Sequence, residues 1–319
     1  MLGISSVVGS VVGMAVTGGT TRGFLQGALS GALISLLVTG ARIAVGRLGA
    51  SRRGFGVYVA VTALLTAAAI SAGLATASLP WLLLEGFPPW RAYLVPFLAA
   101  VAISVAFTWW FALDRLLGAG VLRGLITGRY HQPRREDRIF LFADLQASTR
   151  LAEQLGELRY HAFLNRAFAD AGEPVERHAG VIYQYVGDQM VVTWPLERGL
   201  RGWDCLRCPL AINETLREAG EHYERDFGAA PRFRFALHCG PVVAGEIGDL
   251  KREIVFSGDT LNTTARIEAL AKEKKRDLVV SQEVLRRAEL PPDLTAESLG
   301  VHMLRGKEMP LELFALAPR

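Results

Sequence analysis

Hydrophobic and polar positions divide the chain near residue 118. Before that point the uncharged runs 1–21, 23–41, 54–84 and 92–113 are rich in small and aliphatic residues. Runs of about 20 apolar residues are long enough to cross the ~30 Å hydrocarbon core of a bilayer. The pattern predicts an α-helical membrane domain over residues 1–118, with about four transmembrane helices at roughly 3–19, 24–45, 56–79 and 93–117.

The placement of arginines predicts the orientation of this domain. Arg47, Arg52 and Arg53 lie between the second and third apolar runs, and positively charged loops stay on the cytoplasmic side. Four spans then place both termini inside, so we expect a multi-pass protein of the inner (plasma) membrane, with the lipid bilayer as a partner and the later domain in the cytoplasm. Four plain helices are typical of an anchor and dimerisation unit, and a sensor of some ligand is the alternative.

Residues 119–137 join the two halves. Apolar residues give way there to glycine, proline and charge. We interpret this stretch as a juxtamembrane coupling segment, and a basic flank that merely stops membrane transfer explains it equally well.

From residue 138 to 319 the periodicity changes to that of an α+β domain. Apolar alternation and turn residues predict strands at 138–144, 181–186, 190–194, 233–238, 242–247, 253–256, 278–281, 295–304 and 311–317, and helical spacing predicts helices at 150–177, 201–220 and 259–272. The order strand, helix, hairpin, helix, strand is typical of the ferredoxin-like (βαββαβ) arrangement.

Composition narrows the functions that need to be considered. The net charge of +4 arises in an uneven chain, because residues 1–118 contain seven Arg, one Glu, one Asp and no Lys. No basic stripe with interleaved aromatic residues is present, so we expect no nucleic-acid partner. Three cysteines are too few for a disulfide framework, and Cys205 and Cys208 are interpreted as plain thiols at the start of a helix, with a redox role as the alternative.

Candidate chemistry lies in three short motifs. Asp144 ends one predicted strand, and Asp188 follows Gly187 at a predicted hairpin. Two carboxylates at neighbouring strand ends suit hard cations. Asn262 and Arg266 follow a second Gly-Asp pair and share one helix face, from which they could reach a ribose and a phosphate.

Each motif alone also has a purely structural explanation. An Asp after a strand is commonly a turn residue or a helix cap, and Gly-Asp is common at hairpins. In this order and on this strand pattern, however, the motifs resemble those of the class III nucleotidyl cyclases, the adenylate and guanylate cyclase family, over residues 138–318. The resemblance implies the α+β catalytic domain of that family.

The resemblance also assigns metal ligands. It implies that Asp144 and Asp188 bind two Mg²⁺ (or Mn²⁺) ions, with the main-chain carbonyl of Leu145 as a further ligand. In the family these aspartates and the Asn/Arg pair of one site come from different protomers, so we expect a homodimer with composite active sites at its interface.

The same resemblance assigns contacts to the substrate. Asn262 matches the residue that positions the ribose, and Arg266 matches the arginine that stabilises charge on the α-phosphate. Lys307 is the candidate contact for the terminal phosphate, with Arg305 as the alternative.

The positions that read the base depart from the family pattern. Gln184 stands where adenylate cyclases usually have Lys, and Val255 stands where they usually have Asp or Thr. A Gln amide carries one donor end and one acceptor end and can therefore pair with several bases. We expect ATP on the family pattern, and GTP or a pyrimidine nucleotide stays open.

These observations predict a membrane-anchored homodimeric cyclase of bacterial type that converts ATP to 3′,5′-cyclic AMP and pyrophosphate for signalling. A catalytically silent nucleotide-binding regulatory domain is one alternative. A transport or receptor protein that uses the second half only as a scaffold is another.

Overall fold

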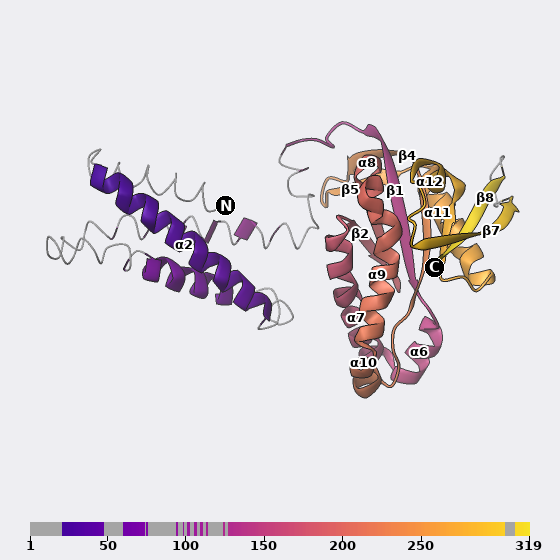
Figure 1. Cartoon of the computed structure of the whole chain (residues 1–319), viewed down its shortest axis with the longest axis horizontal. Coiled ribbons are helices and arrows are strands. Elements are labelled where there is room, and N and C mark those ends of the chain that lie inside the picture. Colours follow the sequence, from indigo (N-terminus) through magenta and orange to yellow (C-terminus); the bar gives the residue numbers. More distant parts are fainter. Residues whose placement is uncertain are drawn as a thin grey trace. The chain divides into compact units, whose positions relative to one another are not determined.

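The computed structural model describes residues 21–47, 60–73, 127–303 and 310–319, together with scattered helical positions between 75 and 124. The chain divides into two compact units, Met1–Leu117 and Gly118–Arg319, which are treated separately below (Figure 1).

The described part of the first unit is helical. Helix α2 spans Thr21–Arg47, and a second helical stretch covers residues 60–73. The two come close at Gly73, where an added Cβ atom would lie 2.7 Å from the Ile34 side chain. A small residue at this point lets the two backbones approach.

None of the helices among the described residues is both long and apolar enough to span a bilayer. The prediction of four membrane-spanning helices is therefore not confirmed. The expected span 3–19 lies outside the described residues, the spans 56–79 and 93–117 lie partly outside, and the span 24–45 falls within helix α2.

The second unit is built on one eight-stranded sheet with the order β2-β3-β1-β4-β6-β8-β7, and β5 pairs with β4 beside this path. The strands are β1 (Arg134–Leu145), β2 (Val181–Val186), β3 (Gln189–Pro195), β4 (Phe233–Ile247), β5 (Glu253–Ser257), β6 (Leu278–Ser281), β7 (Leu294–His302) and β8 (Leu311–Pro318). Strand β1 lies between β3 and β4 and is antiparallel to both.

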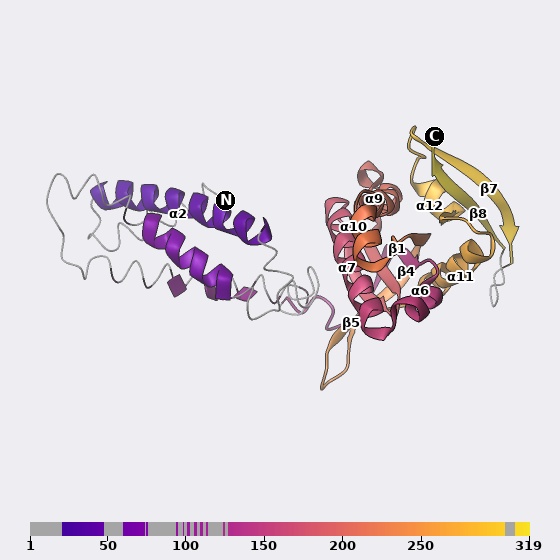
Figure 2. The ribbon, with the colours of Figure 1, turned by 90° about the horizontal axis from the view of Figure 1, so that it is seen from below.

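Helices cover both faces of this sheet. They are α6 (Ser148–Leu155), α7 (Glu157–Arg177), α8 (Leu196–Leu200), the 3₁₀ turn η2 (Arg201–Trp203), α9 (Asp204–Glu218), α10 (Gly220–Phe227), α11 (Asp259–Glu273) and α12 (Gln282–Arg287). Figure 2 shows α7 and α9 on one side of β1 and β4 and α11 on the other.

The two faces explain the continuous apolar run in β1. Ile139, Leu141 and Ala143 are fully buried in the core that includes residues of α7 and α9. Phe140 and Phe142 belong to the second core, which includes Ile267 and Ala271 of α11. A strand covered on both faces loses the alternation of polar and apolar residues.

The strand and helix predictions for residues 138–319 are mostly confirmed, with corrections. The predicted helix 150–177 is two helices, separated at Gly156, whose φ of 71° is left-handed. The strands expected at 233–238 and 242–247 form the single strand β4, which continues through Pro241 because β1 pairs with it from Phe233 to Ala244.

The predicted helix 201–220 is the 3₁₀ turn η2 followed by α9. Helices α8, α10 and α12 were missed, because five, eight and six residues are too few to show a clear helical period.

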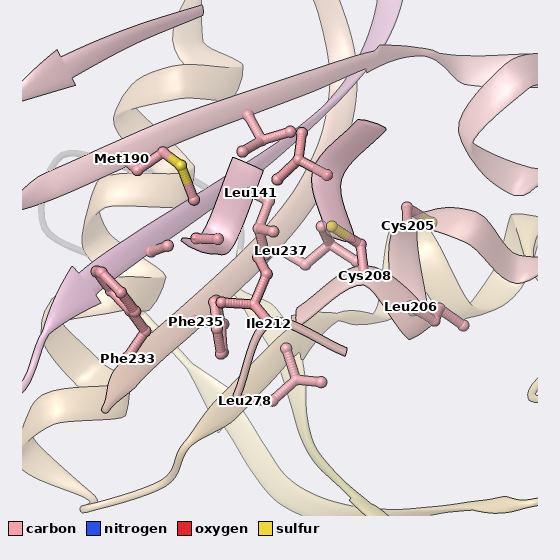
Figure 3. Close-up of a cluster of buried hydrophobic side chains, with 14 of the residues drawn as sticks. Leu141, Met190, Cys205, Leu206, Cys208, Ile212, Phe233, Phe235, Leu237 and Leu278 are labelled. Atoms are coloured by element: carbon pink, nitrogen blue, oxygen red, sulfur yellow. The ribbon is translucent and has the colours of Figure 1, made fainter. Parts of the chain in front are cut away.

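The Cys205-x-x-Cys208 motif lies inside the core. Both thiols are fully buried on α9, and Figure 3 shows them among Leu141, Ile212 and Leu237. Burial raises the pKa of the Cys205 thiol to about 12 and raises that of Cys208 still further. Since the thiolate is the reactive form, this environment supports the interpretation of plain structural thiols over a redox role.

We therefore expect Cys205 and Cys208 to resist iodoacetamide at pH 8 in the folded protein, because the raised pKa values keep both thiols protonated and buried. Alkylation followed by peptide mass spectrometry measures this. The urea-unfolded protein, in which all three cysteines should react, is the control. Rapid labelling of the native α9 peptide would contradict the structural interpretation.

Candidate active site

The two predicted metal aspartates lie side by side at one end of the sheet. Asp144 is the penultimate residue of β1, and Asp188 stands in the turn between β2 and β3. The backbone N–H of Leu145 donates a hydrogen bond of 3.3 Å to the main-chain carbonyl of Asp188, which fixes the turn against the end of β1. Gly187 has a φ of 62°, a left-handed conformation that allows this tight turn.

The electrostatics of Asp144 confirm that the two carboxylates are close. Burial raises the pKa of Asp144 above its ordinary value, and the negative charge of Asp188 raises it further. Lys272 and Arg234 act in the opposite direction. No residue in the described part of the chain forms an ion pair with either carboxylate, so Lys272 and Arg234 act on Asp144 without direct contact.

This donor set fits a divalent cation. Mg²⁺ is usually held by one or two carboxylates plus the phosphates of a substrate, rather than by a cage of protein ligands. Accordingly, the described residues contain no cluster of three or more His, Cys, Asp or Glu side chains that could hold a metal.

Three charged residues near the aspartates were missed in the sequence. Arg234 of β4 stands directly opposite Asp144 in the strand register. Glu268 and Lys272 come from α11, and both Asp144 and Asp188 contribute to the raised pKa of Glu268, for which burial is the largest cause. Glu268 lies on the same helix face as the buried Thr260 and Thr264, because the three residues are four positions apart. A charged residue on that otherwise buried face was the sequence feature that could have identified it.

Asn262 and Arg266 lie on α11 as predicted, with Asn262 exposed and Arg266 half-buried. The helix begins after Gly258, whose φ is 151°, and an added Cβ atom there would lie 3.3 Å from the Pro241 carbonyl oxygen. The Nη1 atom of Arg266 is buried and has no hydrogen-bond partner among the described residues.

Two of the remaining predicted contacts lie on described strands. Gln184 is exposed on β2, and Val255 is half-buried on β5. Lys307 and the alternative Arg305 lie outside the described residues, so their predicted role is untested.

A pocket of about 760 Å³ opens beside Asp188, between α6, α7 and β2. Its lining includes Ser148, Tyr160, Asn165 and Phe168. Burial raises the pKa of Tyr160, with the negative charge of Asp188 as the next cause, so this phenol stays protonated and can donate a hydrogen bond at neutral pH. No local pattern in the sequence indicates this pocket, because its residues come from separate elements.

The charge coupling predicts how Asp144 titrates. Replacing Asp188 with Asn removes a negative charge that disfavours ionisation, so the pKa of Asp144 should fall toward its ordinary value while burial keeps it somewhat raised. Carbon-13 NMR titration of the side-chain carboxyls in metal-free protein measures the change. Asp249→Asn, an exposed change in the loop between β4 and β5, is the matched control, and an unchanged Asp144 pKa in Asp188→Asn would show that the carboxylates are not coupled.

Comparison with known proteins agrees with this arrangement. Residues 131–317 match the model of the adenylate and guanylate cyclase catalytic domain. The chain is 42% identical over 217 residues to Adenylate cyclase 2 of Rhizobium meliloti (strain 1021), which covers 68% of this chain and 60% of that protein. Adenylate cyclase 1 of the same strain is 28% identical over 184 residues, covering 56% of this chain and 27% of that one.

Solved structures show the same fold. A bacterial light-regulated adenylyl cyclase superposes with a TM-score of 0.57 at 21% identity, covering 69% of this chain and 64% of its own. The guanylyl cyclase Cya2 gives a TM-score of 0.51 at 20% identity, covering 58% of this chain and 93% of its own. The chain thus spans less than two thirds of the length of the first relatives of each kind. With the family model matching more than half of its residues, this chain belongs to the adenylate and guanylate cyclase catalytic domain family.

Proposed function

We propose that the protein is a homodimeric adenylate cyclase that converts ATP to 3′,5′-cyclic AMP and pyrophosphate. The observation that carries the proposal is the pair of neighbouring carboxylates, Asp144 and Asp188, at the end of the sheet. The 42% identity to a protein named adenylate cyclase supports ATP as the substrate.

In this proposal Asp144 and Asp188 hold two Mg²⁺ (or Mn²⁺) ions, with the carbonyl oxygen of Leu145 as a further ligand. When bound, such ions supply positive charge that stabilises the attacking and leaving oxygens of a phosphoryl transfer. The ribose 3′-hydroxyl loses its proton to solvent, and its oxygen attacks the α-phosphorus. The bond from that phosphorus to the bridging oxygen breaks, and pyrophosphate leaves with the electron pair.

The chain's other residues orient the nucleotide and stabilise its charge. Asn262 is exposed and available to a ribose hydroxyl. The unpartnered Nη1 of Arg266 is available to an α-phosphate oxygen, and a guanidinium hydrogen bond to phosphate is charge-assisted. We assign Lys307 to the terminal phosphate on the family pattern.

The dimer is proposed on the family pattern, in which the metal aspartates and the Asn/Arg pair of one site come from different protomers. The exposed Asn262, and the buried Nη1 of Arg266 without a partner among the described residues, support this assignment. A second copy related by a twofold axis can supply its Asn262 and Arg266 to the first copy's carboxylates, and symmetry then creates two equal sites.

The base contacts are assigned to Gln184 and Val255. The exposed Gln184 amide can donate to and accept from the Watson–Crick edge of adenine. The same group turned over can pair with guanine, so the adenine preference requires support from the surrounding backbone.

We also propose that residues 1–118 attach the enzyme to the inner (plasma) membrane, with the catalytic domain in the cytoplasm. The four long uncharged runs and the arginines between the second and third support this assignment.

A mixing experiment tests the composite site. Asp144→Asn and Arg266→Ala proteins should each be inactive with ATP and Mg²⁺. A mixed dimer, however, retains one intact site, formed by the carboxylates of one chain and the Arg of the other. Random exchange of equal amounts should therefore recover about a quarter of the wild-type rate of cyclic AMP formation, measured by mass spectrometry after co-refolding or co-expression.

Two outcomes would contradict the proposal in different ways. If the mixture recovers no activity while the wild type is active, the whole site lies within one chain.

GTP, CTP and UTP, each offered separately, serve as substrate controls. A wild-type dimer that forms no cyclic product from any of the four would favour the silent regulatory alternative.

Membrane attachment is tested by fractionation. After expression in bacteria, the full chain should sediment with membranes and stay there after carbonate washing, because apolar helices resist extraction by high pH. A protein lacking residues 1–118 is the control and should remain in the supernatant. Full-length protein in the carbonate supernatant would contradict the anchor.

A further inference from the structure

A bulge in strand β2 determines which face of the sheet Gln184 occupies. Ile182 pairs with Val192 of β3, whereas Gln184 pairs with the adjacent Val191, so Tyr183 is an extra residue without a cross-strand partner. Directly paired residues share a face. Val192 belongs to the core that includes α7 and α9, and Val191 belongs to the core that includes α11. The bulge therefore turns Gln184 to the α11 face, as bulges near active sites commonly do.

The Tyr183 side chain extends from this bulge to strand β5. Its ring packs edge-on against Phe256, with the ring centroids 5.0 Å apart. Its hydroxyl accepts a hydrogen bond of 3.3 Å from the backbone N–H of Phe256. In the described sheet, β5 pairs only with β4. The Tyr183 hydroxyl therefore gives the Phe256 N–H an acceptor that does not belong to a paired strand.

Phe256 is itself firmly held. Its ring packs edge-on against Phe140 at 5.7 Å, and the guanidinium of the buried Arg138 lies 4.4 Å from its centroid. The Tyr183 hydroxyl thus connects a bulge in β2 to a strand whose side chain is anchored in the core. Burial raises the pKa of Tyr183, and the phenol is therefore neutral at physiological pH.

The two residues that this connection joins are the chain neighbours of the two positions assigned to the base. Tyr183 directly precedes Gln184, and Phe256 directly follows Val255. We propose that Tyr183 is a positioning residue for base selection: its bond to the Phe256 amide fixes the spacing between Gln184 and Val255, and this spacing supplies the discrimination that a Gln amide alone lacks. This inference rests on the proposed cyclase function.

Tyr183→Phe removes the hydroxyl and keeps the aromatic packing. One lost hydrogen bond corresponds to about three- to tenfold in affinity. We expect KM for the preferred nucleotide to rise by about that factor, the less preferred nucleotide to change less than twofold, and kcat to stay within about twofold, because neither the carboxylates nor Arg266 are touched.

Tyr223→Phe is the matched control. Its hydroxyl donates a 2.7 Å hydrogen bond to Asp170, and its ring is fully buried away from the base-reading strands. The same chemical change there should lower stability without changing the preference between nucleotides. If both variants lose the preference between nucleotides, the cause is a general loss of stability, and the inference is overturned.

The experiment combines kinetics with a readout that needs no turnover. Binding of 3′-deoxy-ATP and 3′-deoxy-GTP, which cannot cyclise, is measured with Mg²⁺ on wild-type, Tyr183→Phe and Tyr223→Phe full-length dimers. Amide hydrogen exchange at residue 256 is followed by NMR in the same proteins. In Tyr183→Phe alone, we expect the ratio of the affinities for 3′-deoxy-ATP and 3′-deoxy-GTP to move closer to one. We also expect the amide hydrogen of Phe256 to exchange faster in this variant.

The outcomes separate this inference from the proposed function. A wild-type dimer that binds ATP in preference to GTP but forms no product contradicts the cyclase, while the affinity ratio in Tyr183→Phe still decides the role of Tyr183. An unchanged ratio in Tyr183→Phe overturns the inference even if the enzyme is fully active. A wild-type ratio near one also overturns it, because no preference would then exist for Tyr183 to maintain.

Discussion

The repulsion between two neighbouring carboxylates is the constraint on which the rest of the catalytic domain depends. Asp144 and Asp188 are brought together by the hydrogen bond from Leu145 N–H to the carbonyl of Asp188 and by the left-handed turn at Gly187. Burial and like charge raise the pKa of Asp144, which is unfavourable for a carboxylate without an ion-pair partner. The fold tolerates this arrangement because β1 is held between β3 and β4 and buried on both faces. Its stability therefore comes from packing, and its polar end is left available for ligands.

Helix α11 divides its faces between two tasks. Thr264, Ile267 and Ala271 are fully buried against the sheet, and this contact fixes the rotation of the helix about its axis. With that rotation fixed, Glu268 lies near Asp144 and Asp188, whose charges raise its pKa, whereas Asn262 is exposed. In the proposed function, the same helix would place Glu268 beside the carboxylates of its own chain and present Asn262 and Arg266 to a second copy.

The aromatic cluster beside this helix links strands that are distant in the sheet order. Phe256 of β5 contacts both Phe140 of β1 and Tyr183 of β2, although β2 and β5 do not pair. The opposite core holds Cys205 and Cys208, and the raised pKa values of these thiols are consistent with a purely structural role. Tyr160, which packs against the same core, lines the pocket beside Asp188.

The α+β order of the catalytic half can be predicted from the sequence, because the apolar run Ile139–Phe142 and the helical spacing within Leu158–Phe168 are both local patterns. The sequence also indicated Asp144, Asp188, Asn262 and Arg266, because each belongs to a short motif with fixed spacing. Only the tertiary structure revealed the positions of Arg234, Glu268 and Tyr183 relative to the site. Arg234 reaches Asp144 through strand pairing across 90 residues, Glu268 through the rotation of a packed helix, and Tyr183 through a bulge that shifts the register by one residue. Such relations depend on which segments pair and in what register, and a local pattern of apolar and polar residues does not encode them.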